Sequence, residues 1–193
     1  MMNTIERYKA RWVVHGFMEI LDEHFSPDST HAPVASDSSL LVMMSLVAIR
    51  VLKIKQMDAK SAFLNSPLIH DVWVRFPDGY VHSLGHSFTK LCKSLYGPKQ
   101  AAADWYELQH HRLMALDPAL ERSHSTFCLH YRVKDGHSFF VLVYVDGYAV
   151  AYSDQQYFDE CLAHLCGTPE TDDFLDIKHV EDVTHLVQMR ITC

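Results

Sequence analysis

The chain has 193 residues, of which 48% are apolar and 21% are charged. This is the composition of one ordinary globular domain, and it excludes a disordered protein. The N-terminus is charged from the sixth residue onward, which excludes a secretory signal. The longest apolar run, Leu40–Ile49, is shorter than the roughly 20 residues of a membrane-spanning helix. We therefore predict a soluble protein of one domain, without a membrane partner.

The five cysteines are odd in number and form no C-x-x-C pair. This pattern predicts neither a disulfide framework nor a zinc ribbon, and it favours a reducing, intracellular setting, either cytoplasmic or nuclear. Of the 14 histidines, His110 and His111 are adjacent and should point to different faces, while His179 and His185 lack partners at ligand spacing. We interpret the histidines as scattered surface or core residues rather than as a structural zinc site.

The formal net charge of −7 argues against strong autonomous binding of nucleic acid. Phosphate binding draws its free energy from Lys and Arg side chains that displace counterions. Local basic clusters do occur, and each could bind phosphate or could be the solvated face of a helix or strand. The clusters are Arg7, Lys9 and Arg11, then Lys53, Lys55 and Lys60, and then Lys90, Lys93 and Lys99.

The first predicted helix follows a loop rich in Ser, Pro, Asp and His. Ser36, Asp37 or Ser38 can cap it, and apolar residues at nearly every position of Leu40–Val51 predict a mostly buried helix. Basic and apolar side chains then alternate along Lys53–Asp58, which predicts a half-buried strand.

A second short strand is predicted at Val72–Phe76, and a loop containing Gly and His leads from it to Thr89–Ser94. The next helix should start near Lys99. Residues of good helix propensity continue from there until Asp117-Pro118, which should terminate the helix.

The strongest local signal is a predicted hairpin of two apolar strands, Phe139–Val145 and Tyr148–Tyr152. They flank Asp146-Gly147, a dipeptide favoured in two-residue type I′ turns. Beyond the hairpin, Gln155–Cys166 is typical of a helix and His185–Ile191 of a final strand. The order of elements predicts an α+β fold in which helices cover one face of a sheet.

Two acidic residues, Asp58 and Asp146, stand at the ends of predicted strands. Two carboxylates on adjacent strands could hold divalent metal ions about 3.5 to 4 Å apart for an in-line phosphoryl displacement. The alternative is that both are ordinary turn aspartates. An unrelated hydrolase lacks support, because the sequence contains no G-x-S-x-G elbow, no P-loop and no H-E-x-x-H motif.

Several further blocks occur in the order and approximate spacing of copia-type reverse transcriptases, and together they span most of the chain. The blocks are Arg7–Arg11, His15–Phe17, Phe25–Pro27, Gln56–Asn65, Ser94–Gly97 with Lys99–Ala101, Trp105-Tyr106, Tyr144–Asp146, Asp182–Leu186 and Met189–Ile191. The chain therefore resembles that family. The resemblance implies a single partial domain, a fingers and palm fragment whose palm sheet is antiparallel. Residues 1–52 would be a fingers remnant with the buried helix, and residues 53–193 the palm.

By this resemblance, Asp58 and Asp146 would be the catalytic, Mg²⁺-binding aspartates, with the backbone carbonyl of Ala59 beside them. Phe63 would stack under the incoming sugar and clash with a ribose 2′-hydroxyl, the group that separates ribonucleotides from deoxynucleotides. Its other interpretation is a core phenylalanine. In either case the two aspartates must lie on neighbouring strands of one sheet.

The same resemblance gives Lys9 and Arg11 the role of offsetting triphosphate charge. Gln100 would open the helix that lies under the template and the nucleotide, where backbone amides can meet phosphate. The implied partners are an RNA or DNA template-primer and a deoxynucleoside triphosphate.

The family's hairpin reads Tyr-Val-Asp-Asp, whereas this chain has Gly147 after Asp146. Because glycine accepts a positive φ, the change should preserve the turn while it removes one oxygen ligand. The resemblance therefore implies an RNA-directed DNA polymerase fragment with impaired catalysis. The alternative is a non-catalytic module that binds protein or nucleic acid, or a pseudogene product derived from the element. The net negative charge favours a protein over a nucleic acid as the partner of such a module.

Overall fold

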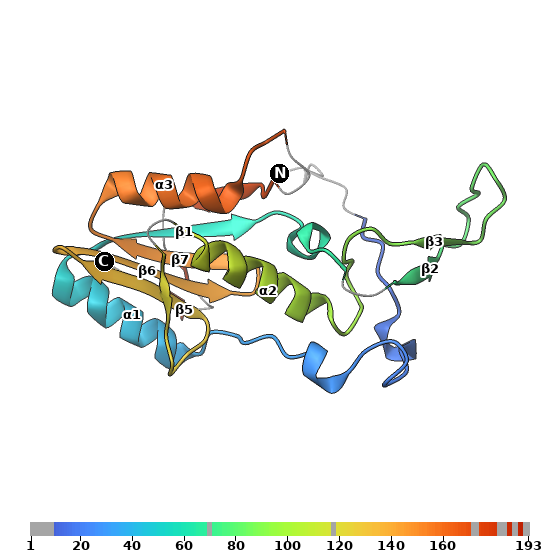
Figure 1. Ribbon diagram of the computed structural model, residues 1–193, viewed down its shortest axis with the longest axis horizontal. Coiled ribbons are helices and arrows are strands. Elements are labelled where there is room, and N and C mark those ends of the chain that lie inside the picture. Colours follow the sequence, from blue (N-terminus) through green and yellow to red (C-terminus); the bar gives the residue numbers. More distant parts are fainter. Residues whose placement is uncertain are drawn as a thin grey trace, which may run out of the picture.

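The computed structural model describes residues 10–68, 71–116, 119–170, 174–180, 185–186 and 189–190. Its centre is one antiparallel sheet (Figure 1). The strands of this sheet are β1 (Lys53–Ala59), β4 (Glu121–Arg122), β5 (Leu129–Lys134), β6 (His137–Tyr144), β7 (Gly147–Tyr152) and β8 (Ile177–Val180). They lie in the order β4-β5-β6-β7-β1-β8, so that β1, from early in the chain, pairs between two late strands.

The other described elements are three α-helices, three short 3₁₀ helices and two small hairpins. The helices are α1 (Asp37–Arg50), α2 (Ala101–Met114), α3 (Gln155–Cys166), η1 (Gly16–Met18), η2 (Pro27–Ser29) and η3 (Ala62–Asn65). The hairpins pair β2 (Trp73–Arg75) with β3 (Phe88–Lys90), and β9 (His185–Leu186) with β10 (Met189–Arg190). Among the described residues, no helix is both long and apolar enough to cross a bilayer.

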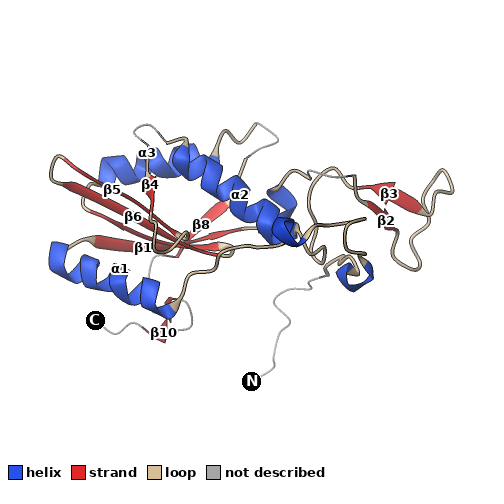
Figure 2. Cartoon of the chain, turned by 60° about the horizontal axis from the view of Figure 1, so that its bottom comes forward, coloured by secondary structure: helices blue, strands red, loops and turns tan. Residues whose placement is uncertain are grey.

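Helices cover both faces of the sheet (Figure 2). Val141 and Val143 of β6 pack in one apolar cluster with residues of α2 and α3, whereas Phe140 and Leu142 pack in a second cluster with Leu40 of α1. The prediction of a sheet covered on one face was therefore wrong. Successive strand residues point to opposite faces, so a strand that is apolar at consecutive positions needs cover on both sides.

Helix α1 begins where the sequence indicated. Ser36 is the N-cap, and its hydroxyl accepts a hydrogen bond from the backbone N–H of Ser39 at 3.2 Å. The helix is not mostly buried, however, because only one side of it meets the sheet. Leu40 is 1% exposed, whereas Leu41 and Ile49 on the outer side are 59% and 78% exposed.

The predictions for β1 and α3 are confirmed, and α3 is capped by Asp154, which accepts a hydrogen bond from Tyr157 N at 2.9 Å. The single final strand predicted at the C-terminus was wrong in its described part, which forms the two short strands β9 and β10. Strands β4, β5 and β8 were not predicted. The expected helix terminator, residues 117–118, lies outside the described residues.

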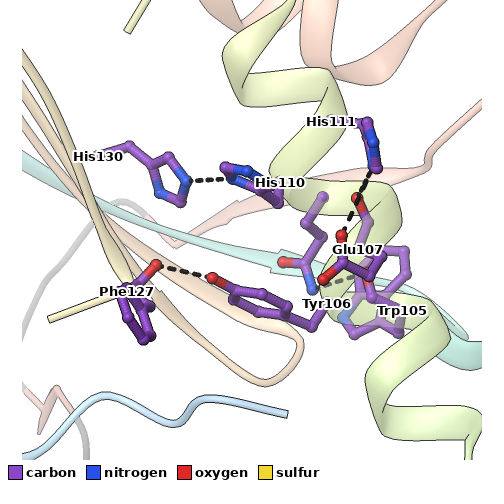
Figure 3. A network of polar contacts seen from close by, with 8 residues as sticks. Trp105, Tyr106, Glu107, His110, His111, Phe127 and His130 are labelled. Carbon is purple, nitrogen blue, oxygen red and sulfur yellow. Dashed lines mark hydrogen bonds and ion pairs between the residues drawn. The ribbon is translucent and has the colours of Figure 1, made fainter. Parts of the chain in front are cut away.

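Two hydrogen bonds join α2 to residues 127–130, at the start of β5 (Figure 3). The Tyr106 hydroxyl donates to the carbonyl of Phe127 at 2.9 Å, and the rings of His110 and His130 share a hydrogen bond of 3.0 Å. Burial lowers the pKa of His130 to about 4, so the imidazole is neutral near pH 7. These contacts fix α2 against the sheet that carries the candidate site.

Candidate functional site

Asp58 of β1 and Asp146, in the turn that precedes the neighbouring strand β7, lie at the same end of the sheet. Asp58 of β1 pairs directly with Gly147 of β7, and the backbone N–H of Ala59 donates to the carbonyl oxygen of Asp146 at 2.8 Å. The fold thus brings together the backbones of two aspartates that are far apart in sequence, at one end of one sheet.

The turn that carries Asp146 differs from the expected one. Its two central residues are Val145 and Asp146, because Tyr144 pairs with Gly147. Val145 has a φ of 54°, and Gly147 is the first residue of β7 and has no positive φ. The predicted Asp-Gly type I′ turn was therefore wrong by one residue, and backbone freedom is not what position 147 requires.

Contacts from α2 explain why the local preference for Asp-Gly is overridden. The carbonyl oxygen of Val145 accepts hydrogen bonds from Trp105 Nε1 at 2.7 Å and from Gln109 Nε2 at 3.1 Å. Both bonds need Val145 inside the turn, with its carbonyl directed at α2. A tertiary contact of this kind is invisible to a sequence pattern that weighs only neighbouring residues.

The electrostatics of the pair suit a cation. Burial first, and then the negative charge of Asp146, raise the pKa of Asp58, while Lys178 opposes the rise. Lys178 lies on β8, directly across from Asp58. Hard carboxylate oxygens that repel one another are the donors a divalent cation such as Mg²⁺ prefers, so the two side chains fit such an ion.

A third carboxylate, that of Asp176, lies close by but is engaged elsewhere. It forms an ion pair with Lys60, two positions after Asp58, and its backbone carbonyl accepts from Lys60 N at 2.9 Å. In the part of the chain that the structure describes, no group of three or more His, Cys, Asp or Glu side chains could hold a metal ion. The candidate site is therefore a pair of carboxylates.

Position 147 has room for a side chain. A Cβ atom built on Gly147 would lie 3.5 Å from the carbonyl oxygen of Tyr144 and 3.8 Å from that of Met57, which are ordinary contact distances. Directly paired residues of antiparallel strands point to the same face, with Cβ atoms about 5 Å apart. A carboxylate at position 147 would therefore lie on the same face as Asp58.

Phe63 and Arg11, which the sequence analysis singled out separately, meet on Tyr96. Phe63 of η3 contacts the Tyr96 ring edge-on, with centroids 5.1 Å apart, and the Arg11 guanidinium lies 5.1 Å above the same ring. Phe63 is half-buried at the margin of the core cluster. Tyr96 was not predicted as a site residue, although it stood in the block that contains Gly97.

Gln100, another residue that the family resemblance assigns to the nucleotide, lies at the start of α2. Gln100 is the N-cap of α2 but makes no capping hydrogen bond, and only 5% of it is exposed. Its side-chain oxygen is buried without a hydrogen-bond partner in the described residues. The adjacent N–H of Lys99 is taken by a carboxylate oxygen of Glu19 at 2.9 Å. Lys9 lies outside the described residues.

Asp58→Asn is expected to raise the thermal unfolding midpoint at pH 7, with a gain in stability below about 1 kcal/mol because the group is exposed. The pKa of Asp58 is raised in the folded chain, so ionised Asp58 opposes folding. The gain should vanish below about pH 4, where the unfolded chain also protonates its aspartates. Thermal unfolding at pH 7 and pH 3 measures it, with Asp135→Asn at the far turn as the control. A lower midpoint at pH 7 would show that ionised Asp58 does not oppose folding.

Comparisons with known proteins show the family to which the chain is similar. Residues 2–186 match the family described as reverse transcriptase (RNA-dependent DNA polymerase). The chain is 34% identical over 151 residues to the retrovirus-related Pol polyprotein from transposon TNT 1-94 of Nicotiana tabacum, covering 77% of this chain. It is 29% identical over 196 residues to that from transposon RE1 of Arabidopsis thaliana, covering 97% of this chain. The matched parts are 11% and 13% of those polyproteins. No solved structure matches the chain.

Proposed function

Because the chain belongs to the reverse transcriptase family of copia-type retrotransposons, we propose that it is a fingers and palm fragment of an RNA-directed DNA polymerase with impaired catalysis. The observation that carries the proposal is the pairing of strands β1 and β7. It sets Asp58 beside the turn that holds Asp146, at one end of an antiparallel sheet. The substrates would be an RNA or DNA template-primer and a deoxynucleoside triphosphate.

Each residue of the site has a role that its surroundings support. Asp58 and Asp146 would hold Mg²⁺, and this ion would activate the primer 3′-hydroxyl and neutralise charge on the attacked phosphate. Arg11 would offset triphosphate charge, and the half-buried ring of Phe63 would border the sugar. The contact of both residues with Tyr96 supports a common nucleotide-binding wall.

We infer impaired catalysis from the small number of oxygen ligands that the site offers to a metal ion. Gly147 supplies none, and Asp176 is paired with Lys60. Lys178 also lies across from Asp58 and competes for its negative charge. Removing a single preorganised electrostatic group from an active site typically slows a reaction by about 100-fold or more. We therefore propose a weak metal site in a preserved scaffold.

Primer extension on an RNA template with Mn²⁺ tests the proposal, together with fluorescence anisotropy of a labelled template-primer. The unaltered chain is expected to bind template-primer and to incorporate only traces of deoxynucleotide, and Asp58→Asn should abolish the traces while binding persists. Incorporation that survives Asp58→Asn would overturn the assigned site. Absence of template-primer binding at low salt would instead favour the alternative, a non-catalytic interaction module.

A further inference from the structure

We propose that Trp105 and Gln109 are positioning residues that hold the Val145-Asp146 turn, and thereby aim the Asp146 carboxylate at Asp58. The inference rests on the proposed function, since it assigns how the proposed metal site is kept in shape. Both residues act through one backbone carbonyl, that of Val145.

The conformation of Val145 needs such support. Its φ of 54° lies in the left-handed region, which a β-branched residue avoids because its side chain crowds the following peptide. A two-residue turn with no glycine in it would relax unless something outside the hairpin fixed it. The two hydrogen bonds from α2 reach the residue under strain and no other residue of the turn.

The burial of Gln109 supports a dedicated role. The side chain is 1% exposed, and its amide nitrogen donates to Val145 at 3.1 Å and to the backbone of Trp105 at 3.4 Å. Its amide oxygen is buried without a partner in the described residues. An apolar residue at position 109 would avoid the cost of burying an unpaired amide oxygen. The presence of an amide there is therefore explained by the hydrogen bond that its nitrogen donates to the Val145 carbonyl.

Helix α2 is itself a firm support. Tyr106 and His110, on the same helix, are bonded to Phe127 and His130, as Figure 3 shows. The indole of Trp105 is 1% exposed and belongs to the core cluster that packs the sheet against α2. The turn that carries Asp146 is therefore held by a helix that is itself fixed at several points. Loss of the hydrogen bond from Trp105 or from Gln109 should let the backbone of the turn move.

The test compares Gln109→Met and Trp105→Phe with Tyr106→Phe. Trp105→Phe and Tyr106→Phe each remove one hydrogen bond from a buried α2 side chain to a backbone carbonyl, and Gln109→Met removes two, to Val145 and Trp105. The Tyr106 bond ends on Phe127, away from the turn. Unfolding in urea should show comparable losses of stability in all three. Two readouts then separate positioning from mere stability: the pKa of Asp58 measured by NMR titration of its carboxyl carbon, and Mn²⁺ affinity measured by water-proton relaxation.

Gln109→Met and Trp105→Phe are expected to move the pKa of Asp58 back toward its ordinary value and to weaken Mn²⁺ binding by roughly tenfold. Tyr106→Phe should change neither. If the pKa of Asp58 responds as expected while the parent chain binds no Mn²⁺, the positioning stands and the proposed function fails. If the pKa of Asp58 in the Gln109 and Trp105 variants equals that in Tyr106→Phe, the positioning role is overturned.

Discussion

Gly147→Asp is expected to bind Mn²⁺ roughly 10 to 100 times more tightly than the unaltered chain, because ligand charge and number set the affinity of oxygen sites. Position 147 is opposite Asp58 in the ladder, and a Cβ there meets only ordinary contacts. The introduced carboxylate therefore joins an existing pair without moving the backbone. Titration with Mn²⁺ by water-proton relaxation measures the affinity.

The same variant should raise deoxynucleotide incorporation on an RNA template by about 100-fold or more, the effect typical of one preorganised group. Gly147→Asn is the matched control, since it adds nearly the same volume without a charge. Combining Gly147→Asp with Asp58→Asn should return the affinity to that of a two-carboxylate site. An equal Mn²⁺ affinity of the Asp and Asn variants would show that the side chain at position 147 does not face the metal, despite its pairing with Asp58.

Without metal, Gly147→Asp should slightly lower the unfolding midpoint. Position 147 has no positive φ, so the substitution carries no penalty of backbone conformation. The pKa of Asp58 is already raised, first by burial and then by the charge of Asp146, and the introduced charge adds to this repulsion. The effect of Mn²⁺ on the midpoint should consequently be larger in the variant, because a ligand that binds only the folded state stabilises it.

The sequence predicts this region well where local patterns decide the structure, and poorly where distant contacts do. Strand β1 and helix α3 follow from alternation and from helical periodicity. The run Phe139–Val143 is apolar at every position, which indicates a strand buried on both faces, and the predicted one-sided sheet neglected that signal. Strand β8 has four residues and is defined by its pairing with β1, so no local pattern marks it.

The candidate site shows the same division. Asp58 and Asp146 could be found because strand ends and the family resemblance both point to them. Lys178 could not, since only the pairing of β8 brings it to Asp58. The hairpin turn lies one residue earlier than predicted, because its position depends on hydrogen bonds to the Val145 carbonyl from α2, some 40 residues away in sequence. Residues that act through a backbone carbonyl, such as Gln109, leave no motif of their own.

Gly97→Ala is expected to destabilise the fold by about 3 kcal/mol or more, through a clash and an unfavourable φ together. Gly97 has a φ of 114°, and a Cβ on it would lie 2.0 Å from the carbonyl oxygen of Val14. That carbonyl cannot retreat freely, because the N–H of Val14 donates to the carbonyl of Tyr96 at 2.8 Å. The two segments must separate, and Arg11 should leave the ring of Tyr96 with them.

Gly79→Ala is the matched control, since Gly79 also has a positive φ, 86°, but nothing lies within 4 Å of a Cβ there. Gly79→Ala should lower the free energy of unfolding by only about 1 kcal/mol, which is the cost of the positive φ alone. Urea unfolding measures both losses, and limited proteolysis of the segment before Gly16 reports its release in Gly97→Ala. Because Phe63 and Arg11 meet on Tyr96, the same variant should also weaken nucleotide binding, whereas Gly79→Ala should not. Equal losses of stability in the two variants would mean that the backbones of Val14 and Gly97 do not approach closely. The proposed nucleotide-binding wall would then lose its support.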